Sequence, residues 1–198
     1  ARPHVFQRGS SSRTLLLLHG TGADEYDLLG LARALDLEAS VLSPRGMHLE
    51  SGMNRFFERY PDGSFNEASI DQGVAELSEF IEAAIVEYEL DRSNIFGAGF
   101  SNGANTAAAL LIKHPALLSG AALFGSTKPY RAVDDINLKG KHIWLANGDQ
   151  DPYAPVQVSE AWVQELHSFG ADIKWLRHPG GHQISQSHVT EIANALYL

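Results

Sequence analysis

Short apolar runs alternate along the chain with longer segments whose apolar positions repeat every three or four residues. Runs of strand length occur at residues 14–18, 41–43, 95–100, 121–124, 142–146 and 173–176. Helical spacing occurs at residues 28–35, 70–88, 104–112, 158–169 and 184–198. Strands that are apolar throughout and are separated by helices are typical of a parallel sheet covered on both faces. The pattern therefore predicts an α/β fold built on a mostly parallel sheet with helices on both faces.

Boundary signals at three of these helices follow the usual capping preferences. Asp24 is expected to be the N-cap of the first helix. Ser69 and Gln72 have the spacing of a capping box at the start of the second helix. Gly170 is expected to end the helix at residues 158–169.

Residues 46–66 show neither the strand nor the helix period. Their aromatic and basic residues include Arg55, Phe56, Phe57 and Tyr60. We expect a long loop over the edge of the sheet at which the strands end, where ligands bind in folds of this class. Long ordered loops in compact domains are more often functional than idle.

The composition is that of an ordinary globular protein, with 44% hydrophobic and 20% charged residues among 198. A chain of this length is expected to form one domain over residues 1–198. The net charge is −9 without a basic cluster, which argues against binding to nucleic acid or to an anionic membrane. No apolar run approaches the roughly 20 residues of a membrane-spanning helix, and no signal peptide is recognisable. A cytoplasmic location is expected, and a homodimer is compatible with the sequence.

The strongest chemical signal is the pentapeptide Gly-Phe-Ser-Asn-Gly at residues 99–103. It has the form G-x-S-x-G and lies between a predicted strand and a predicted helix. In such a turn the serine takes a strained backbone conformation that exposes its hydroxyl group. A side chain at either flanking glycine would clash with the neighbouring strand or helix, and the helix N-terminus favours nearby negative charge. Ser101 is therefore the candidate nucleophile.

A nucleophilic serine needs a base to take its proton and an acid to orient that base. With this type of turn, the acid and then the histidine follow the serine along the chain. Asp149 and Asp151 follow one predicted strand, and His178 and His182 follow the last one. Asp151 is favoured as the acid because Pro152 biases it toward an extended conformation, whereas Asp149 suits a turn. His182 is favoured as the base because it lies on a glycine-rich loop, whereas His178 belongs to the strand end.

Acyl transfer also requires hydrogen-bond donors for the oxyanion of the tetrahedral intermediate. The backbone N–H of Asn102, the residue after the candidate nucleophile, is expected to be one donor. The second is expected from the glycine loop after the first core strand, where the N–H of Thr21 is favoured.

Neither a cofactor nor a metal ion is expected. The glycine loop lacks the G-x-G-x-x-G pattern of dinucleotide-binding proteins, and the chain has no Walker lysine. His178, His182 and His188 lack a convincing zinc-ligand spacing. The absence of cysteine excludes a thiol nucleophile and metal sites built on cysteine.

Taken together, these residues resemble the α/β-hydrolase superfamily and, within it, the small phospholipase/carboxylesterase family, which includes acyl-protein thioesterases and bacterial carboxylesterases. The resemblance covers nearly the whole chain and rests on residues 18–22, 99–103, 148–152 and 181–182. It implies that the aspartate directly before proline and the histidine of the last loop are the acid and the base, which are Asp151 and His182. Residues 42–46 and 55–57 resemble a bacterial subgroup named for hydroquinone-linked hydrolases. Thioesterases of the family usually have glutamine at the position of Asn102.

The resemblance also implies a trimmed α/β-hydrolase fold. Only residues 4–7 are available for an additional edge strand. We therefore expect a sheet of about seven strands and no separate cap domain.

The sequence predicts metal-independent hydrolysis of a carboxylic ester through an acyl-enzyme on Ser101. Phe56, Phe57 and Tyr153 are the candidates for the substrate pocket. Without a cap the site should be open and suited to small or short-chain esters. An acyl thioesterase or a lysophospholipase acting on longer chains would use the same residues. A non-catalytic relative that binds a small apolar ligand is the alternative from another class of protein.

Overall fold

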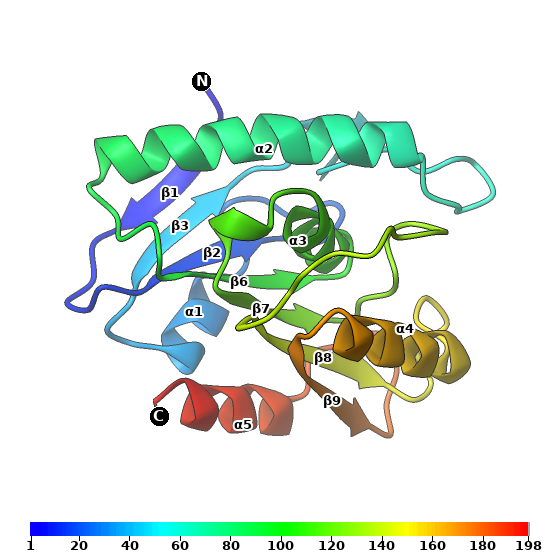
Figure 1. The fold of residues 1–198 in the computed structure, drawn as a ribbon. Helices are drawn as coiled ribbons and strands as arrows, with labels where there is room; N and C mark the ends of the chain where they lie inside the picture. The colour runs from blue at the N-terminus through cyan, green and yellow to red at the C-terminus, as the bar shows by residue number, and fades with distance from the viewer. Residues whose placement is uncertain (198) are drawn as a thin grey trace.

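A seven-stranded sheet forms the centre of the molecule in the computed structural model, which describes residues 1–197 (Figure 1). In spatial order its strands are β1 (His4–Gln7), β3 (Ser40–Pro44), β2 (Thr14–Leu18), β6 (Ile95–Phe100), β7 (Gly120–Phe124), β8 (His142–Gly148) and β9 (Asp172–His178). β1 pairs antiparallel with β3, and the other neighbouring strands of this sheet pair in parallel. The predicted strands and the predicted edge strand are confirmed.

Helices cover both faces of the sheet, as predicted (Figure 1). One face carries α1 (Leu29–Leu35) and α5 (Gln186–Leu196), and the other carries α2 (Glu67–Glu87), α3 (Asn102–Lys113) and α4 (Val156–Ser168). A short 3-10 helix, Pro115–Leu117, follows α3. Successive residues of β2 alternate between two cores: Leu15 and Leu17 lie under α1 and α5, and Leu16 and Leu18 lie under α2 and α3. The last residue of the predicted helix at 184–198 lies outside the described residues.

Two of the predicted helix starts are wrong, and the predicted stop is confirmed. Asp24 accepts a hydrogen bond from the N–H of Tyr26 (2.9 Å) in a turn that precedes α1, whose N-cap is Leu28. The N-cap of α2 is Asn66, whose side chain accepts from the N–H of Ser69 (3.2 Å). Gly170 follows the end of α4 with a φ of +91°, a conformation that favours glycine.

The segment at residues 46–66 is more ordered than predicted. It contains an antiparallel hairpin of β4 (His48–Glu50) and β5 (Met53–Arg55). Ser51 and Gly52 both have positive φ at its turn, as tight hairpin turns require. Strands of three residues are too short to show a period, so the sequence could not reveal them. This hairpin lies outside the large sheet.

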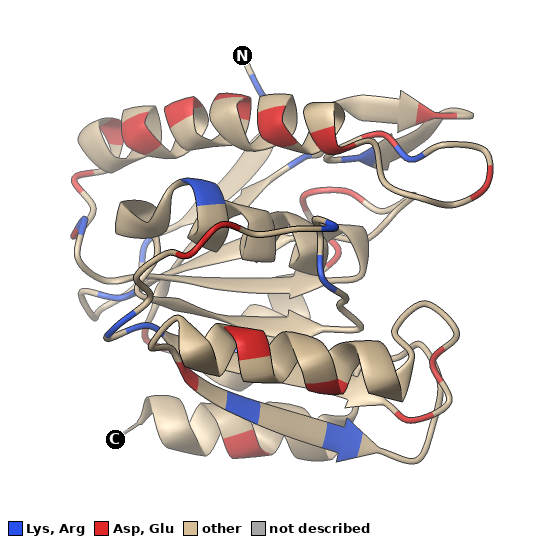
Figure 2. Cartoon of the chain, turned by 45° about the vertical axis from the view of Figure 1, so that its right-hand side comes forward, with Lys and Arg blue, Asp and Glu red and all other residues tan. Residues whose placement is uncertain are grey.

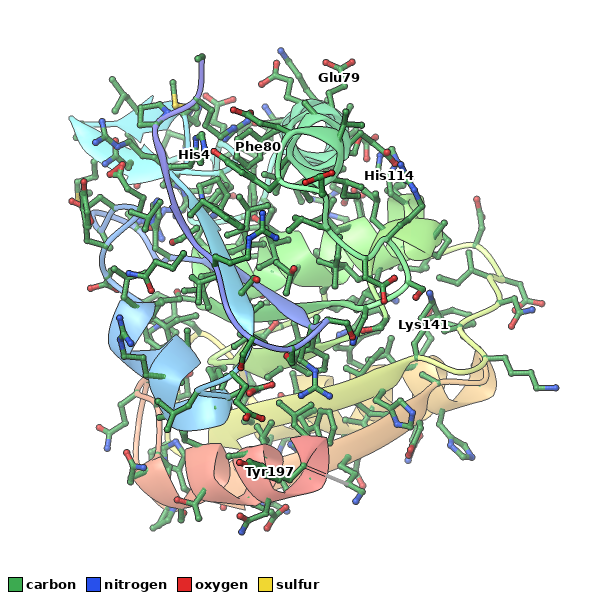
Figure 3. The ribbon with its side chains drawn as sticks, turned by 90° about the vertical axis from the view of Figure 1, so that its left-hand side faces the viewer. His4, Glu79, Phe80, His114, Lys141 and Tyr197 are labelled. Carbon is green, nitrogen blue, oxygen red and sulfur yellow. The ribbon has the colours of Figure 1, made fainter. Side chains whose placement is uncertain are left out.

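The edge strand β1 is held by α2 as well as by β3. The rings of His4 and Phe80 meet edge to face at 5.0 Å (Figure 3). The His4 imidazole also shares a hydrogen bond with the hydroxyl of Tyr88 (2.7 Å), which follows the C-terminus of α2. These contacts attach the N-terminal strand to the longest helix.

Negative charge is concentrated on α2, which carries six acidic residues and no lysine or arginine (Figure 2). The acidic residues are exposed or half-buried, while the opposite side of the helix packs into the core. None of the helices in residues 1–197 combines the length and the hydropathy needed to cross a bilayer.

Helix α3 lies unusually close to β2 at its first turn. A Cβ atom on Gly103 would overlap the carbonyl oxygen of Leu18 and would lie 2.5 Å from that of His19. Both of these atoms belong to the backbone, so they cannot move aside without displacing the centre of the sheet.

We therefore predict that Gly103→Ala destabilises the protein by at least about 2 kcal/mol, because the added methyl overpacks a rigid backbone contact. The control is Gly30→Ala in α1, where a Cβ would meet nothing within 4 Å. That variant should be neutral or more stable by up to about 1 kcal/mol. Urea unfolding followed by circular dichroism measures both. An unchanged midpoint for Gly103→Ala would contradict the predicted clash.

Candidate active site

Ser101 occupies the turn between β6 and α3 and has strained backbone angles, φ 54° and ψ −118°. Such a conformation costs a non-glycine residue on the order of 1–3 kcal/mol. The N–H of Ser101 donates to the carbonyl oxygen of Phe124 (2.9 Å), which anchors the turn to β7. Ser101 lines a cavity of about 680 Å³.

The glycines on both sides of Ser101 are required by close packing, as the sequence indicated. A Cβ on Gly99 would lie 2.7 Å from the backbone nitrogen of Ala104 in α3. Gly103 meets the backbone of β2, as described above. The turn can therefore form only where positions 99 and 103 both lack a side chain.

His182 and Asp151 complete a hydrogen-bonded chain that begins at Ser101. The Ser101 hydroxyl lies 2.9 Å from Nε2 of His182, and Nδ1 of His182 lies 2.6 Å from Oδ2 of Asp151. The Asp151 side chain is completely buried, and its Oδ1 accepts from the N–H of Tyr153 (2.8 Å). A carboxylate oxygen can only accept, so Nδ1 of His182 carries the proton and Nε2 is free to accept from Ser101. Gly125 leaves room for the imidazole, because a Cβ there would lie 2.9 Å from His182 Cε1.

Asp149 and His178, the candidates not favoured above, lie elsewhere. Asp149 forms an ion pair with Arg177 at the surface (2.8 Å). His178 is buried, accepts from the N–H of Gly180 (3.1 Å) and donates to the carbonyl oxygen of Gln183 (3.1 Å). It therefore braces the loop that carries His182. The sequence placed His178 at the strand end, as a packed or solvated histidine, and did not show this contact.

His178 and His188 face each other, with ring centroids 5.1 Å apart, while His182 faces Ser101 and Asp151. Within residues 1–197 no group of three or more histidine and acidic side chains is arranged to hold a metal ion.

Thr21 and Asn102 each have a backbone N–H without a protein acceptor in the described part of the chain. Both residues line the same cavity as Ser101. The loop that carries Thr21 reaches the nucleophile turn, since a Cβ on Gly20 would lie 3.6 Å from Cβ of Ser101. The side chain of Asn102 points another way, and its Oδ1 accepts from the N–H of Phe56 (2.8 Å). It ties the nucleophile turn to the segment at 46–66.

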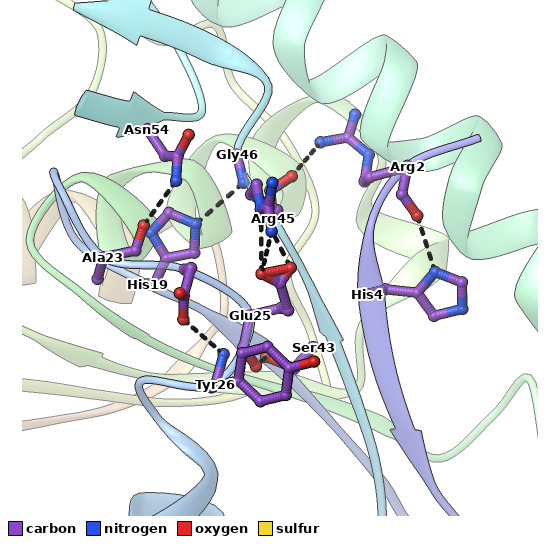
Figure 4. Close-up of polar contacts among 11 residues, drawn as sticks. Arg2, His4, His19, Ala23, Glu25, Tyr26, Ser43, Arg45, Gly46 and Asn54 are labelled. Carbon is purple, nitrogen blue, oxygen red and sulfur yellow. Dashed lines mark hydrogen bonds and ion pairs between the residues drawn. The ribbon is translucent and has the colours of Figure 1, made fainter. Parts of the chain in front are cut away.

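The loop at residues 19–25 is held in place by residues that follow β3 and by β5 (Figure 4). His19 accepts from the N–H of Gly46 at Nε2 (3.0 Å) and donates from Nδ1 to the carbonyl oxygen of Gly20 (2.7 Å). Asn54 donates to the carbonyl oxygen of Ala23 (3.0 Å). These contacts hold the loop on both sides of Thr21.

An ion pair between a partly exposed arginine and a buried carboxylate adds to this bracing. Arg45 holds the carboxylate of Glu25 through Nη2 (2.8 Å) and Nε (3.0 and 3.1 Å). Glu25 is almost fully buried. Arg45 belongs to residues 42–46, which carry part of the family resemblance, and nothing local to it indicated that it pairs with a residue twenty positions earlier.

The predicted substrate pocket is partly corrected by the structure. Tyr153 lines the cavity, and its ring lies 4.8 Å from that of His182. Phe56 and Phe57 do not line it, since both belong to the hydrophobic core under α2 and are 6% and 1% exposed. The reason is that α2 passes directly over them, and a Cβ on Gly73 would lie 2.5 Å from the carbonyl oxygen of Phe56.

Other residues line the cavity that the sequence did not assign to it. Four are apolar, namely Ala23, Phe65, Phe100 and Pro152, and the polar or charged ones are Asp27, Arg55, Arg59, Asp62, Ser64, Asn105 and Thr127. Their only signal in the sequence was that several lie in the irregular segment at 46–66.

A doubly covered parallel sheet with a strained serine at the end of a central strand defines an α/β-hydrolase. Residues 5–198 match the model of the phospholipase/carboxylesterase family, and the chain belongs to this family. It is 38% identical over 194 residues to MhqD of Bacillus subtilis (strain 168), a protein named as a hydrolase, with 98% of this chain and 96% of MhqD covered.

Solved structures of two carboxylesterases are similar to the whole chain. The Bacillus cereus carboxylesterase has a TM-score of 0.95 and 42% identity, covering 98% of this chain and 92% of that one. The Mesorhizobium loti carboxylesterase has a TM-score of 0.89 and 28% identity, covering 96% and 90%. These likenesses agree with the predicted fold and family.

We predict that His19 makes stability depend on pH. Burial lowers the pKa of His19 below its ordinary value of 6.5. Below about pH 6.5 the unfolded chain takes up a proton at His19 that the folded protein does not, so the stability that this residue contributes is lost as pH falls. The Tm of the wild type minus the Tm of His19→Gln should therefore be smaller at pH 5.5 than at pH 7.5. Thermal unfolding of both proteins measures it, and a constant difference would contradict a lowered pKa.

Proposed function

We propose that the protein is a serine carboxylesterase that hydrolyses small or short-chain carboxylic esters through an acyl-enzyme on Ser101. The observation that carries the proposal is the chain of hydrogen bonds from Ser101 through His182 to the buried Asp151, at 2.9 and 2.6 Å. Membership of the phospholipase/carboxylesterase family supports it.

In the first half of the reaction the Ser101 hydroxyl gives its proton to Nε2 of His182 while Oγ attacks the ester carbonyl carbon. The oxyanion that forms accepts from the N–H groups of Thr21 and Asn102, and each such donor contributes roughly 3–4 kcal/mol to the lowering of the barrier. His182 then gives the proton to the leaving alcohol, and the acyl group stays on Ser101.

In the second half, His182 takes a proton from water, whose oxygen attacks the acyl carbonyl carbon. The same two N–H groups stabilise the second oxyanion. When this intermediate collapses, the carboxylic acid leaves and the proton returns to Ser101. Asp151 keeps the imidazole in the tautomer with its proton on Nδ1 and stabilises the imidazolium that forms in both halves.

The walls of the cavity favour small polar esters over long acyl chains. A long apolar chain would need a continuous apolar channel, whereas this cavity has Asp27, Arg55, Arg59 and Asp62 among its lining residues. Its volume of about 680 Å³ is in the range of small-molecule sites. This argues against thioesterase or lysophospholipase activity on long chains as the main function.

Ser101→Ala should fold normally and lose about 10⁶-fold in kcat, because the nucleophile is absent. Intact mass after incubation with a fluorophosphonate is the direct test. The wild type should gain a single adduct, and Ser101→Ala none. The matched control is Ser187→Ala, an exposed serine outside the cavity, which should keep the adduct. An adduct on Ser101→Ala, or none on the wild type, would refute the proposal.

Asp151→Asn should lower kcat by about 10⁴-fold, because an amide in this place favours the wrong tautomer of His182. Asp149→Asn should keep most of the activity, since it removes only a surface ion pair with Arg177 worth about 1 kcal/mol or less in stability. Initial rates on a short-chain ester, with circular dichroism to verify folding, compare the two variants. The reverse order of losses would assign the acid to Asp149.

A further inference from the structure

One charged group in the cavity has no role in the proposed reaction. Arg55, at the end of β5, is only 2% exposed and lines the cavity next to Ser101 and Thr21. Taking a charged side chain out of water costs several kcal/mol unless an opposite charge compensates it. The partners of Arg55 therefore decide whether it is merely structural.

The Arg55 guanidinium is held close to the reacting groups by neutral acceptors. Its Nε donates to the carbonyl oxygen of Phe57 (2.9 Å), and its Nη1 donates to the hydroxyl of Thr21 (2.5 Å). The N–H of the next residue, Phe56, is bound by the Asn102 side chain. Arg55 is thus linked to both residues that we assign to the oxyanion site.

No carboxylate within residues 1–197 forms an ion pair with Arg55. Glu50, the acidic residue whose charge acts on it most, is already engaged by Nε and Nη2 of Arg59 (2.9 and 3.0 Å). Burial lowers the pKa of Arg55 to about 10, with the positive charge of Arg59 acting in the same direction. The group therefore remains charged at neutral pH, and its Nη2 has no acceptor in the described chain.

A purely structural role does not require this charge. The two oxygens bound by Arg55 are neutral, and neutral acceptors can be satisfied by uncharged donors, which are less costly to bury. The Phe57 ring, whose centroid is 5.3 Å from the guanidinium carbon, compensates only part of the charge. The acidic residues that line the cavity, Asp27 and Asp62, are exposed and form no ion pair with Arg55.

We propose that the substrate is a small ester that also carries a carboxylate group, and that Arg55 is the specificity-determining residue that binds this carboxylate. The inference rests on the proposed esterase function and narrows its substrate class. Guanidinium is suited to carboxylate because its planar array of N–H groups can donate two parallel hydrogen bonds. Binding the anion would supply the compensating charge that the folded protein lacks at this position.

The first test compares charged and neutral esters of nearly equal shape on the wild type. Monoethyl succinate against ethyl succinamate places the carboxylate or its amide on the acyl side. O-acetylglycolate against O-acetylglycolamide places it on the alcohol side. In at least one pair, kcat/KM for the carboxylate should exceed that for the amide by tenfold or more. The pair that shows this difference also tells whether Arg55 binds a carboxylate on the acyl side or on the alcohol side of the ester. Equal values in both pairs would overturn the proposal without any variant.

The second test uses Arg55→Gln, which keeps a donor near the position of Nε for Phe57 but removes the charge. It should lower the carboxylate-to-amide ratio of kcat/KM by about tenfold to a hundredfold, with a much smaller change for the amide ester alone. Arg55→Lys, which keeps the charge without the planar array, should retain part of the ratio. An equal loss on both esters would mean that Arg55 only supports the loop, and would overturn the proposal.

Thr21→Val serves as the matched control for that structural role. It removes the hydroxyl that anchors Arg55 and leaves the guanidinium in the cavity, so it should lower activity on both esters and preserve most of the ratio. Fluorophosphonate labelling of the same proteins separates the two levels of the proposal. If the wild type is labelled and hydrolyses the neutral ester but does not prefer the charged one, only the role of Arg55 is overturned. If the wild type is not labelled, the esterase function itself is refuted.

Discussion

Helix α3 lies so close to strands β2 and β6 that neither Gly99 nor Gly103 can carry a side chain. This backbone contact determines where Ser101 lies and forces its positive φ of 54°. The strain is offset by the packing of the surrounding sheet, in whose central strands β2 and β6 every residue but Phe100 is buried. The remaining parts of the site are arranged around a hydroxyl group that this contact holds at the end of β6.

The loop at residues 19–25 is positioned from outside itself. It is short and glycine-rich, and its own residues make few contacts that would select one conformation. One conformation is selected by hydrogen bonds that join the loop to the end of β3 and to the β4–β5 hairpin, and they involve His19, Arg45 and Asn54. The hairpin therefore supports the loop whose Thr21 N–H we assign to oxyanion binding.

The buried ionisable groups around the site differ in how their charge is compensated. Asp151, Glu25, His19 and His178 all have hydrogen-bond partners that suit their charge or tautomer. Arg55 differs, because its acceptors are neutral and its charge is uncompensated within the described chain. Among the buried charged groups around the site, this uncompensated charge has its simplest physical explanation in a ligand of opposite charge.

The sequence by itself determined the layered α/β architecture, because apolar runs and helical periods directly report which residues are buried. It also indicated Ser101 and the choice of Asp151 and His182, since the strained turn needs glycines at set positions and the other two residues follow strand ends. It did not determine the helix caps at Leu28 and Asn66 or the hairpin within residues 46–66, where the signals are short and compete locally. Tertiary structure alone decided that Phe56 and Phe57 are core and that Arg55 faces the cavity. Those outcomes depend on how α2 and the loop at 19–25 pack against one segment, and contacts between distant parts of the chain leave no local pattern.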